Sequence, residues 1–213
     1  MEATQAVGLA HFIAQTDAVG KGLLAILVAM SLLSWYLIAA KAFAAWRERR
    51  RARALLDAFH ESPSIGVVQR HLDREDSFSR LASRALQAHG RGDSEFLTRA
   101  MRRSLEEEMV RREFGLTALA SVGATAPFVG LFGTVWGVYH ALVNIGMSGQ
   151  GTLDQVAGPV GEALIMTALG LAVAIPAVLA YNAFVRSNRV VLARLDAFAH
   201  DLFAALIPAP AAS

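Results

Sequence analysis

A long stretch of the chain without a charged side chain covers residues 22–40 and lies between Lys21 and Lys41. Its 19 residues are mostly apolar. A helix needs about 20 such residues to cross a bilayer whose hydrocarbon core is about 30 Å thick. The pattern therefore predicts a first transmembrane helix over residues 22–40.

A longer apolar region covers residues 114–185. It has no Lys or Arg, and its only acids are Asp154 and Glu162. Residues 144–155 interrupt it with Gly, Ser, Asn and Asp, which are residue types that form turns. The region therefore predicts a helical hairpin, with a second transmembrane helix over residues 114–143 and a third over residues 156–185.

The polar sequence between the first two spans is helical in pattern. The stretch WRERRRARALLDAFHE predicts a helix that ends at Ser62 and Pro63. A second helical stretch is expected to reach about His89, where glycines turn the chain. Asp93 or Ser94 then caps a new helix.

From Ser94 onward one helical face is apolar, while Arg and Glu fill the opposite face. The apolar positions are Phe96, Leu97, Ala100, Met101, Leu105 and Met109. We expect this helix to continue without a break through Leu142, which gives a length of about 70 Å at 1.5 Å per residue. We expect the third helix to continue past Arg186 until Pro208. Two of the three spans should therefore extend well beyond the membrane.

Positive charge is distributed very unevenly, because 16 of the 20 Lys and Arg residues lie within residues 41–113. The positive-inside rule places residues 41–113 and 186–213 in the cytoplasm and the arm of residues 1–21 on the outer side. The loop 144–155 contains no Lys or Arg, and the rule places it on the outer side as well. The basic run Arg47–Arg53 is a topology anchor and a candidate contact for anionic membrane lipid. The charge therefore reflects topology and indicates no nucleic acid partner.

Several kinds of chemistry lack the residues they need. Cysteine is absent, which removes disulfides, thiolate nucleophiles and cysteine metal sites. The six His residues show no paired spacing for a metal, and the run GATAPFVGLFG lacks the GK[ST] ending of a phosphate-binding loop. We therefore expect no metal, no cofactor and no enzymatic activity.

Glu162 is the single ionisable side chain in the run GEALIMTALGL of the third span. It lies about seven residues into the helix, roughly 10 Å from the outer boundary at 1.5 Å per residue. Because a charge at that depth costs a few kcal/mol, such a residue normally faces protein or water and carries function. We expect Glu162 to accept and release a proton. A neutral side chain that only bridges two helices is the structural alternative.

Two threonines are further candidate functional residues, Thr134 in the second span and Thr167 in the third. A membrane threonine ordinarily bonds back to the carbonyl one turn earlier, so neither residue alone indicates function. On an ideal helix Thr167 lies about 140° around from Glu162, so one straight stripe cannot centre on both. A bend at Pro159 or a wide lumen would relax that restriction.

Small residues let helix backbones approach closely, which is how membrane helices associate. On the second span they are Gly123, Gly130, Gly133 and Gly137, and on the third span Gly170. We expect this stripe to serve helix packing and assembly.

Proline interrupts both of the later spans, and each proline predicts a kink that neighbouring helices make tolerable. The positions are Pro127, Pro159 and Pro176. A lone acid that needs shelter, together with so much packing surface, predicts a homo-oligomer.

Two runs of these helices are highly characteristic: ATAPFVGLFGTVWG over residues 124–137 and GEALIMTALGLAVAIPAVLAYN over residues 161–182. They resemble the signature helices of the ExbB, TolQ and MotA family of proton-channel proteins. The start ATAPF favours the ExbB branch, whereas His140 in YHAL leans toward the TolQ branch.

The resemblance implies a role for each polar residue of the spans. Glu162 corresponds to the family's membrane glutamate, Thr134 to its pore threonine, and Thr167 to the threonine five residues after the glutamate. The implied fold is an all-α membrane protein with three transmembrane helices, which assembles as a homo-pentamer around a central pore in the bacterial inner membrane.

The implied function is that of a motor subunit that does no covalent chemistry. Its partners would be ExbD, whose helices occupy the pore, and TonB, and protons would be the transported ion. The complex would use the proton-motive force to energise import of iron chelates and vitamin B12 across the outer membrane. Two alternatives remain open: a TolQ-type subunit of the Tol-Pal system, and a passive structural scaffold in the membrane.

Overall fold

The computed structural model describes residues 17–62, 64–70, 72, 76–90, 94–148 and 153–207, and only the backbone of residues 153–157. The arm before Asp17, the cap at Asp93 and the helix end at Pro208, all predicted from sequence, lie outside these residues. So does the centre of the predicted loop 144–155.

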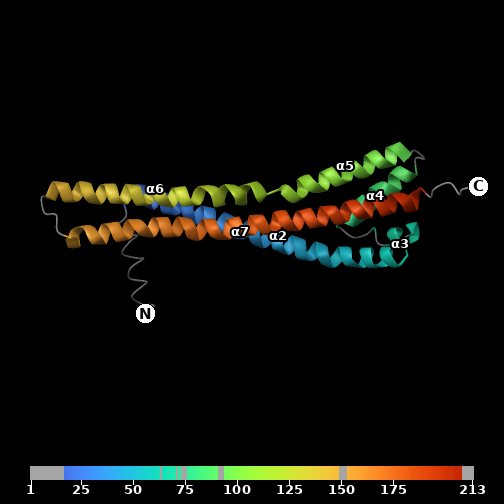
Figure 1. Cartoon of the computed structure of the whole chain (residues 1–213), viewed down its shortest axis with the longest axis horizontal. Coiled ribbons are helices and arrows are strands. Elements are labelled where there is room, and N and C mark those ends of the chain that lie inside the picture. The colour runs from blue at the N-terminus through green and yellow to red at the C-terminus, as the bar shows by residue number, and fades with distance from the viewer. Residues whose placement is uncertain are drawn as a thin grey trace, which may run out of the picture. The chain divides into compact units, whose positions relative to one another are not determined.

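Nearly every described residue is helical (Figure 1). The helices are α2 (Ala18–Glu61), α3 (Ile65–Gln69), α4 (Ser77–His89), α5 (Ser94–Glu113), α6 (Leu116–Ser148) and α7 (Leu153–Leu206). Three segments are long and apolar enough to cross a membrane, one in α2, one in the α5–α6 stretch and one in α7. The prediction of an all-α chain with three candidate membrane helices is confirmed.

The helix predicted to run without interruption from Ser94 through Leu142 is broken, so that prediction is wrong. α5 ends at Glu113 and α6 begins at Leu116, and Gly115 between them has a positive φ of 76°. Glycine adopts this left-handed conformation readily because it has no Cβ, and it commonly ends a helix in this way.

The first and third spans, rather than the second and third, are the ones that continue into polar sequence. α2 has 44 residues and α7 has 54. α7 passes Arg186 and continues to Leu206, as predicted. α2 ends at Glu61, directly before the Ser62-Pro63 pair that predicted its end.

The helix break leaves the carbonyl of Arg112 near the end of α5, where carbonyls lack partners within the helix. Two side chains from other helices supply hydrogen bonds to it. Lys41 Nζ of α2 donates over 3.0 Å, and Asn188 Nδ2 of α7 donates over 3.1 Å. Side chains of two other helices therefore stabilise the end of α5.

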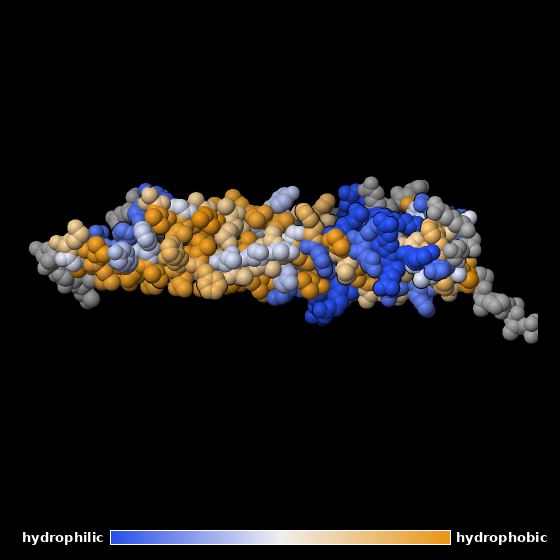
Figure 2. All heavy atoms as spheres, turned by 90° about the horizontal axis from the view of Figure 1, so that it is seen from above, coloured by the Kyte–Doolittle hydropathy of each residue, from blue (hydrophilic) through white to orange (hydrophobic). Residues whose placement is uncertain are grey.

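The helices form two compact units. Unit 1 contains the described residues from 17 to 38 and from 117 to 182, and unit 2 contains those from 39 to 116 and from 183 onward. The surface of unit 1 that Figure 2 shows is mainly hydrophobic. Large side chains such as Tyr36 and Phe128 expose 70% and 69% of their area. Lipid rather than water is a suitable solvent for such a surface.

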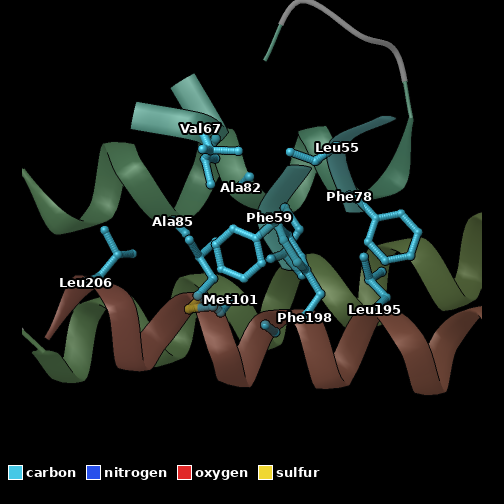
Figure 3. Close-up of a cluster of buried hydrophobic side chains, with 14 of the residues drawn as sticks. Leu55, Phe59, Val67, Phe78, Ala82, Ala85, Met101, Leu195, Phe198 and Leu206 are labelled. Carbon is cyan, nitrogen blue, oxygen red and sulfur yellow. The ribbon is translucent and has the colours of Figure 1, made fainter. Parts of the chain in front are cut away.

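Unit 2 has a core of buried apolar side chains from α2, α3, α4, α5 and α7 (Figure 3). Phe198 of α7 lies among them, with its ring centre 5.1 Å from that of Phe59 and 5.6 Å from that of Phe78. Both contacts are edge-to-face, a geometry worth about 0.5–1.5 kcal/mol beyond area burial. Phe198 therefore joins α2 and α4 to α7.

The helix α4 begins where Asp76 caps it. The Asp76 carboxylate accepts a hydrogen bond from the backbone N–H of Ser79 over 2.9 Å, and this satisfies one of the free donors of the first turn. Apolar residues at helical spacing then bury one face of α4 in the core of unit 2: Phe78, Leu81, Ala82, Ala85 and Ala88.

We predict that Phe198→Ala destabilises unit 2 by about 3–5 kcal/mol, because it removes buried surface and leaves a cavity. Hydrogen exchange read by mass spectrometry should show faster exchange of the amides of α4 and of the second half of α7. Phe43→Ala is the matched control, since Phe43 exposes 62% of its area. Equal exchange in both variants would contradict the assignment of Phe198 to the core.

Candidate functional site

In unit 1, α6 and α7 lie side by side with their backbones almost in contact (Figure 1). A Cβ added at Gly130 would lie 2.6 Å from the carbonyl oxygen of Met166 and 3.0 Å from the Cα of Gly170. A Cβ added at Gly170 would lie 2.7 Å from the carbonyl oxygen of Ala126. Backbone atoms cannot rotate away, so both positions need glycine at this helix spacing.

The three other glycines of the predicted stripe in α6 also face α7 of the same chain. An added Cβ would lie 2.5 Å from a methyl of Val178 at Gly123, 2.9 Å from Met166 at Gly133 and 3.0 Å from Ala163 at Gly137. The predicted stripe is therefore used within the chain, between α6 and α7.

The three prolines lie inside these helices. Pro127 is in α6, and Pro159 and Pro176 are in α7, which continues on both sides of each. Each removes one backbone donor from its helix.

Thr134 and Thr167 meet across the contact between α6 and α7. The hydroxyl oxygen of Thr134 lies 2.5 Å from that of Thr167, 2.9 Å from the carbonyl oxygen of Ala163 and 3.2 Å from that of Gly130. A hydroxyl has one hydrogen to donate. Because the Ala163 carbonyl is nearer than that of Gly130, Thr134 can donate to α7 while it accepts from Thr167.

Thr125 shows the ordinary behaviour of a threonine in a membrane helix. Its hydroxyl lies 2.7 Å from the carbonyl oxygen of Ser121, four residues earlier in α6. The hydroxyl of Thr134 instead has two of its three contacts on the neighbouring helix. The contact of Thr134 with Thr167 therefore goes beyond the local bonding that threonine needs.

Glu162 lies next to this contact along the chain, directly before Ala163, whose carbonyl Thr134 approaches. Its side chain is half-buried. It precedes Thr167 by five residues, which on an ideal helix is a rotation of about 140° and a rise of about 7.5 Å. The structure brings the two threonines together, whereas ideal helix geometry places Glu162 on another face of α7.

A second polar cluster joins the start of α2 to α6. Asp17 caps α2 through a 2.8 Å hydrogen bond from the backbone N–H of Gly20, and the indole N–H of Trp136 donates to the same carboxylate over 2.7 Å. The Trp136 bond first, and then the Gly20 bond, lower the pKa of Asp17. The His140 ring centre lies 4.7 Å from that of Trp136.

No role for Asp17 was predicted from the sequence. An Asp directly before a helical run is a recognised cap signal, so its contact with the helix start could have been found. Its bond to Trp136 could not, because the two residues are 119 positions apart.

Comparison with known proteins gives a consistent result. The model of the MotA/TolQ/ExbB proton channel family matches residues 73–197. The biopolymer transport protein ExbB of Xanthomonas campestris pv. campestris (strain B100) is 46% identical over 194 residues, which cover 83% of this chain and 77% of that protein.

Two further relatives cover most of the chain. The biopolymer transport protein ExbB of Neisseria meningitidis serogroup A is 42% identical over 205 residues, which are 90% of this chain and 93% of that protein. The Tol-Pal system protein TolQ of Pseudomonas aeruginosa is 37% identical over 199 residues, which are 84% of each chain.

We predict that Gly130→Ala lowers stability by about 1–3 kcal/mol, because the new methyl group forces α6 and α7 apart. The midpoint of thermal unfolding in detergent, followed by tryptophan fluorescence, should fall. Gly146→Ala is the control in the same helix, since nothing lies within 4 Å of its added Cβ. It should raise the midpoint or leave it unchanged, because alanine is the better helix former. Equal losses would contradict the close contact.

A double-mutant cycle on Thr134→Val and Thr167→Val should give a coupling free energy of about 0.5–1.5 kcal/mol, the ordinary net value of a hydrogen bond. The thermal midpoints of the wild type, both single variants and the double variant measure it. In a second cycle, Thr125→Val should show no coupling to Thr167→Val. Additive effects in the first cycle would show that the hydroxyls do not interact.

Proposed function

The chain belongs to the MotA/TolQ/ExbB proton channel family, and on that premise we propose that it is an ExbB-type subunit of a biopolymer transport system. In this proposal the protein lies in the bacterial inner membrane, with a periplasmic N-terminus and a cytoplasmic C-terminus. It assembles as a homo-pentamer around a pore and binds ExbD there. The complex uses the proton-motive force to drive TonB-dependent uptake of iron chelates and vitamin B12.

The observation that carries the proposal is the contact between Thr134 and Thr167 inside an apolar helix pair. A hydroxyl both accepts and donates a hydrogen bond. Two adjacent hydroxyls therefore form a hydrogen-bonding pair where most neighbouring side chains are apolar. Glu162 precedes the carbonyl that Thr134 contacts and is the only acid among residues 156–185. These three side chains are the proposed proton path.

The driving force is sufficient for such a role. One charge that crosses 100 mV releases roughly 2.3 kcal/mol, before any contribution from a pH gradient. An acid held in apolar surroundings is costly when charged, so it tends to release its proton only where another group or water can take it up. In the proposal, Glu162 exchanges its proton with an acid on the ExbD helix, and the pentamer moves relative to that helix.

The exposed apolar surface of unit 1 supports both lipid contact and self-association. The glycine stripe of α6 is occupied by α7 of the same chain, so a second copy has to use other faces. Leu131, Phe132 and Val135 expose between 50% and 60% of their area on such faces of α6. We propose that neighbouring subunits cover part of this surface and that membrane lipid covers the rest.

A TolQ-type role in the Tol-Pal system is the second candidate function, favoured by the 37% identity to a TolQ relative. The higher identities of 46% and 42% to ExbB relatives favour the first. The single-span partner that co-purifies with the endogenous complex distinguishes them. Recovery of ExbD supports our proposal, and recovery of TolR replaces it with the second function.

We predict that Glu162→Gln abolishes TonB-dependent uptake of iron chelates in cells that lack the native gene, because glutamine cannot take up and release a proton. Assembly, measured by native electrophoresis of the purified complex, should be unchanged, since glutamine keeps the size of the side chain. Thr125→Val is the control and should leave uptake unchanged.

The same variant tests the scaffold alternative. If Glu162 only bridges helices, Glu162→Gln lowers the thermal midpoint or the yield of assembled complex, while the remaining complex retains uptake. Normal uptake together with normal assembly would overturn the proposed role of Glu162 altogether.

A further inference from the structure

A cavity of about 530 Å³ lies within unit 2 between α2, α5 and α7, with α4 at one side. Its wall includes apolar side chains such as Ala45, Phe78 and Val191. The remaining wall is strongly basic, because seven lining side chains are Lys or Arg and two are Glu. A pocket of this size with convergent polar groups is typical of a ligand site.

The two glutamates neutralise only part of this charge. Glu108 lies 2.7 Å from Arg80 and 3.7 Å from Arg111, and Glu48 pairs with Arg112. Within the described part of the chain, the four other cations have no carboxylate partner. They are Lys41, Arg49, Arg53 and Arg194. The excess of positive charge around one cavity favours an anion.

One residue of the cavity wall, Arg112, carries a buried donor. The Nε–H of Arg112 is buried and has no hydrogen-bond partner among the described residues. A buried donor without a partner is unfavourable. Burial, with a smaller effect of the Arg112 guanidinium, lowers the pKa of Lys41, and an anion beside it would act in the opposite direction.

We propose that this cavity binds a phosphate-bearing anion. Guanidinium groups match phosphate oxygens in geometry and hold them through paired, charge-assisted hydrogen bonds. Two sources share this chemistry, the headgroup of an anionic phospholipid and free phosphate in the cytoplasm. The site uses none of the residues of the Thr134 and Thr167 contact, and it does not depend on the function proposed above.

The source is tested on the full-length protein in two arms. In the first, orthophosphate is titrated into detergent-solubilised protein, with potassium chloride of equal ionic strength as the reference, and thermal unfolding is followed by tryptophan fluorescence. In the second, the protein is placed in nanodiscs of phosphatidylcholine with or without phosphatidylglycerol, free of phosphate. A rise in the midpoint with orthophosphate identifies a free anion, and a rise with phosphatidylglycerol alone identifies a lipid headgroup.

The double variant Arg53→Gln/Arg194→Gln should weaken whichever response the wild type shows by about tenfold or more in apparent affinity. Arg53→Lys/Arg194→Lys keeps both charges and should lose less. Arg99→Gln/Arg102→Gln is the matched control, since it removes two charges from an exposed face of α5 outside the cavity. It should respond as the wild type does.

Without ligand, the Arg53→Gln/Arg194→Gln protein should be at least as stable as the wild type, because it relieves repulsion between cations. A role of these arginines in folding alone would instead lower its midpoint. The proposal is overturned if neither orthophosphate nor phosphatidylglycerol raises the wild-type midpoint above its reference. It is also overturned if the cavity and control variants respond equally.

Discussion

The contact between Thr134 and Thr167 in unit 1 depends on the close approach of the α6 and α7 backbones. Gly130 and Gly170 put no side chain between the helices, so the short side chain of Thr134 reaches across to α7. At the helix separations that larger side chains impose, a threonine hydroxyl would find only the carbonyl of its own helix. The packing of small residues therefore creates the polar contact.

Lipid requires every backbone group to be paired within the protein, which is why apolar length and charge predicted the three membrane helices so directly. The break at Gly115 was missed although its signal was present. Arg111 and Arg112 in the last turn, followed by a glycine, are the usual marks of a helix end. The unbroken apolar pattern that begins just beyond them instead predicts a continuous helix. Sequence periodicity identifies the apolar face of a helical segment. It does not locate a break that divides the segment into two helices.

The candidate site was predictable residue by residue but not as an arrangement. Depth in an apolar run singles out Glu162, and ideal helical spacing predicts that it lies on another face than Thr167. The contact between Thr134 and Thr167 joins residues 33 positions apart, and it depends on the register between two helices. Contacts such as that of Gly130 with Met166 set this register in three dimensions. The charged cavity of unit 2 was hidden for the same reason, since its cations come from separate helices.

The joint at Gly115 gives the three long helices different mechanical properties. In α2 each peptide is tied to the turn before it, so bending this helix strains a continuous ladder of backbone hydrogen bonds, whereas Pro159 and Pro176 each remove one bond from the ladder of α7. At the joint this ladder is interrupted, and side-chain bonds from Lys41 and Asn188 hold the Arg112 carbonyl instead. The break at Gly115 therefore concentrates bending at one residue, whereas α2 spreads any bend over its whole length.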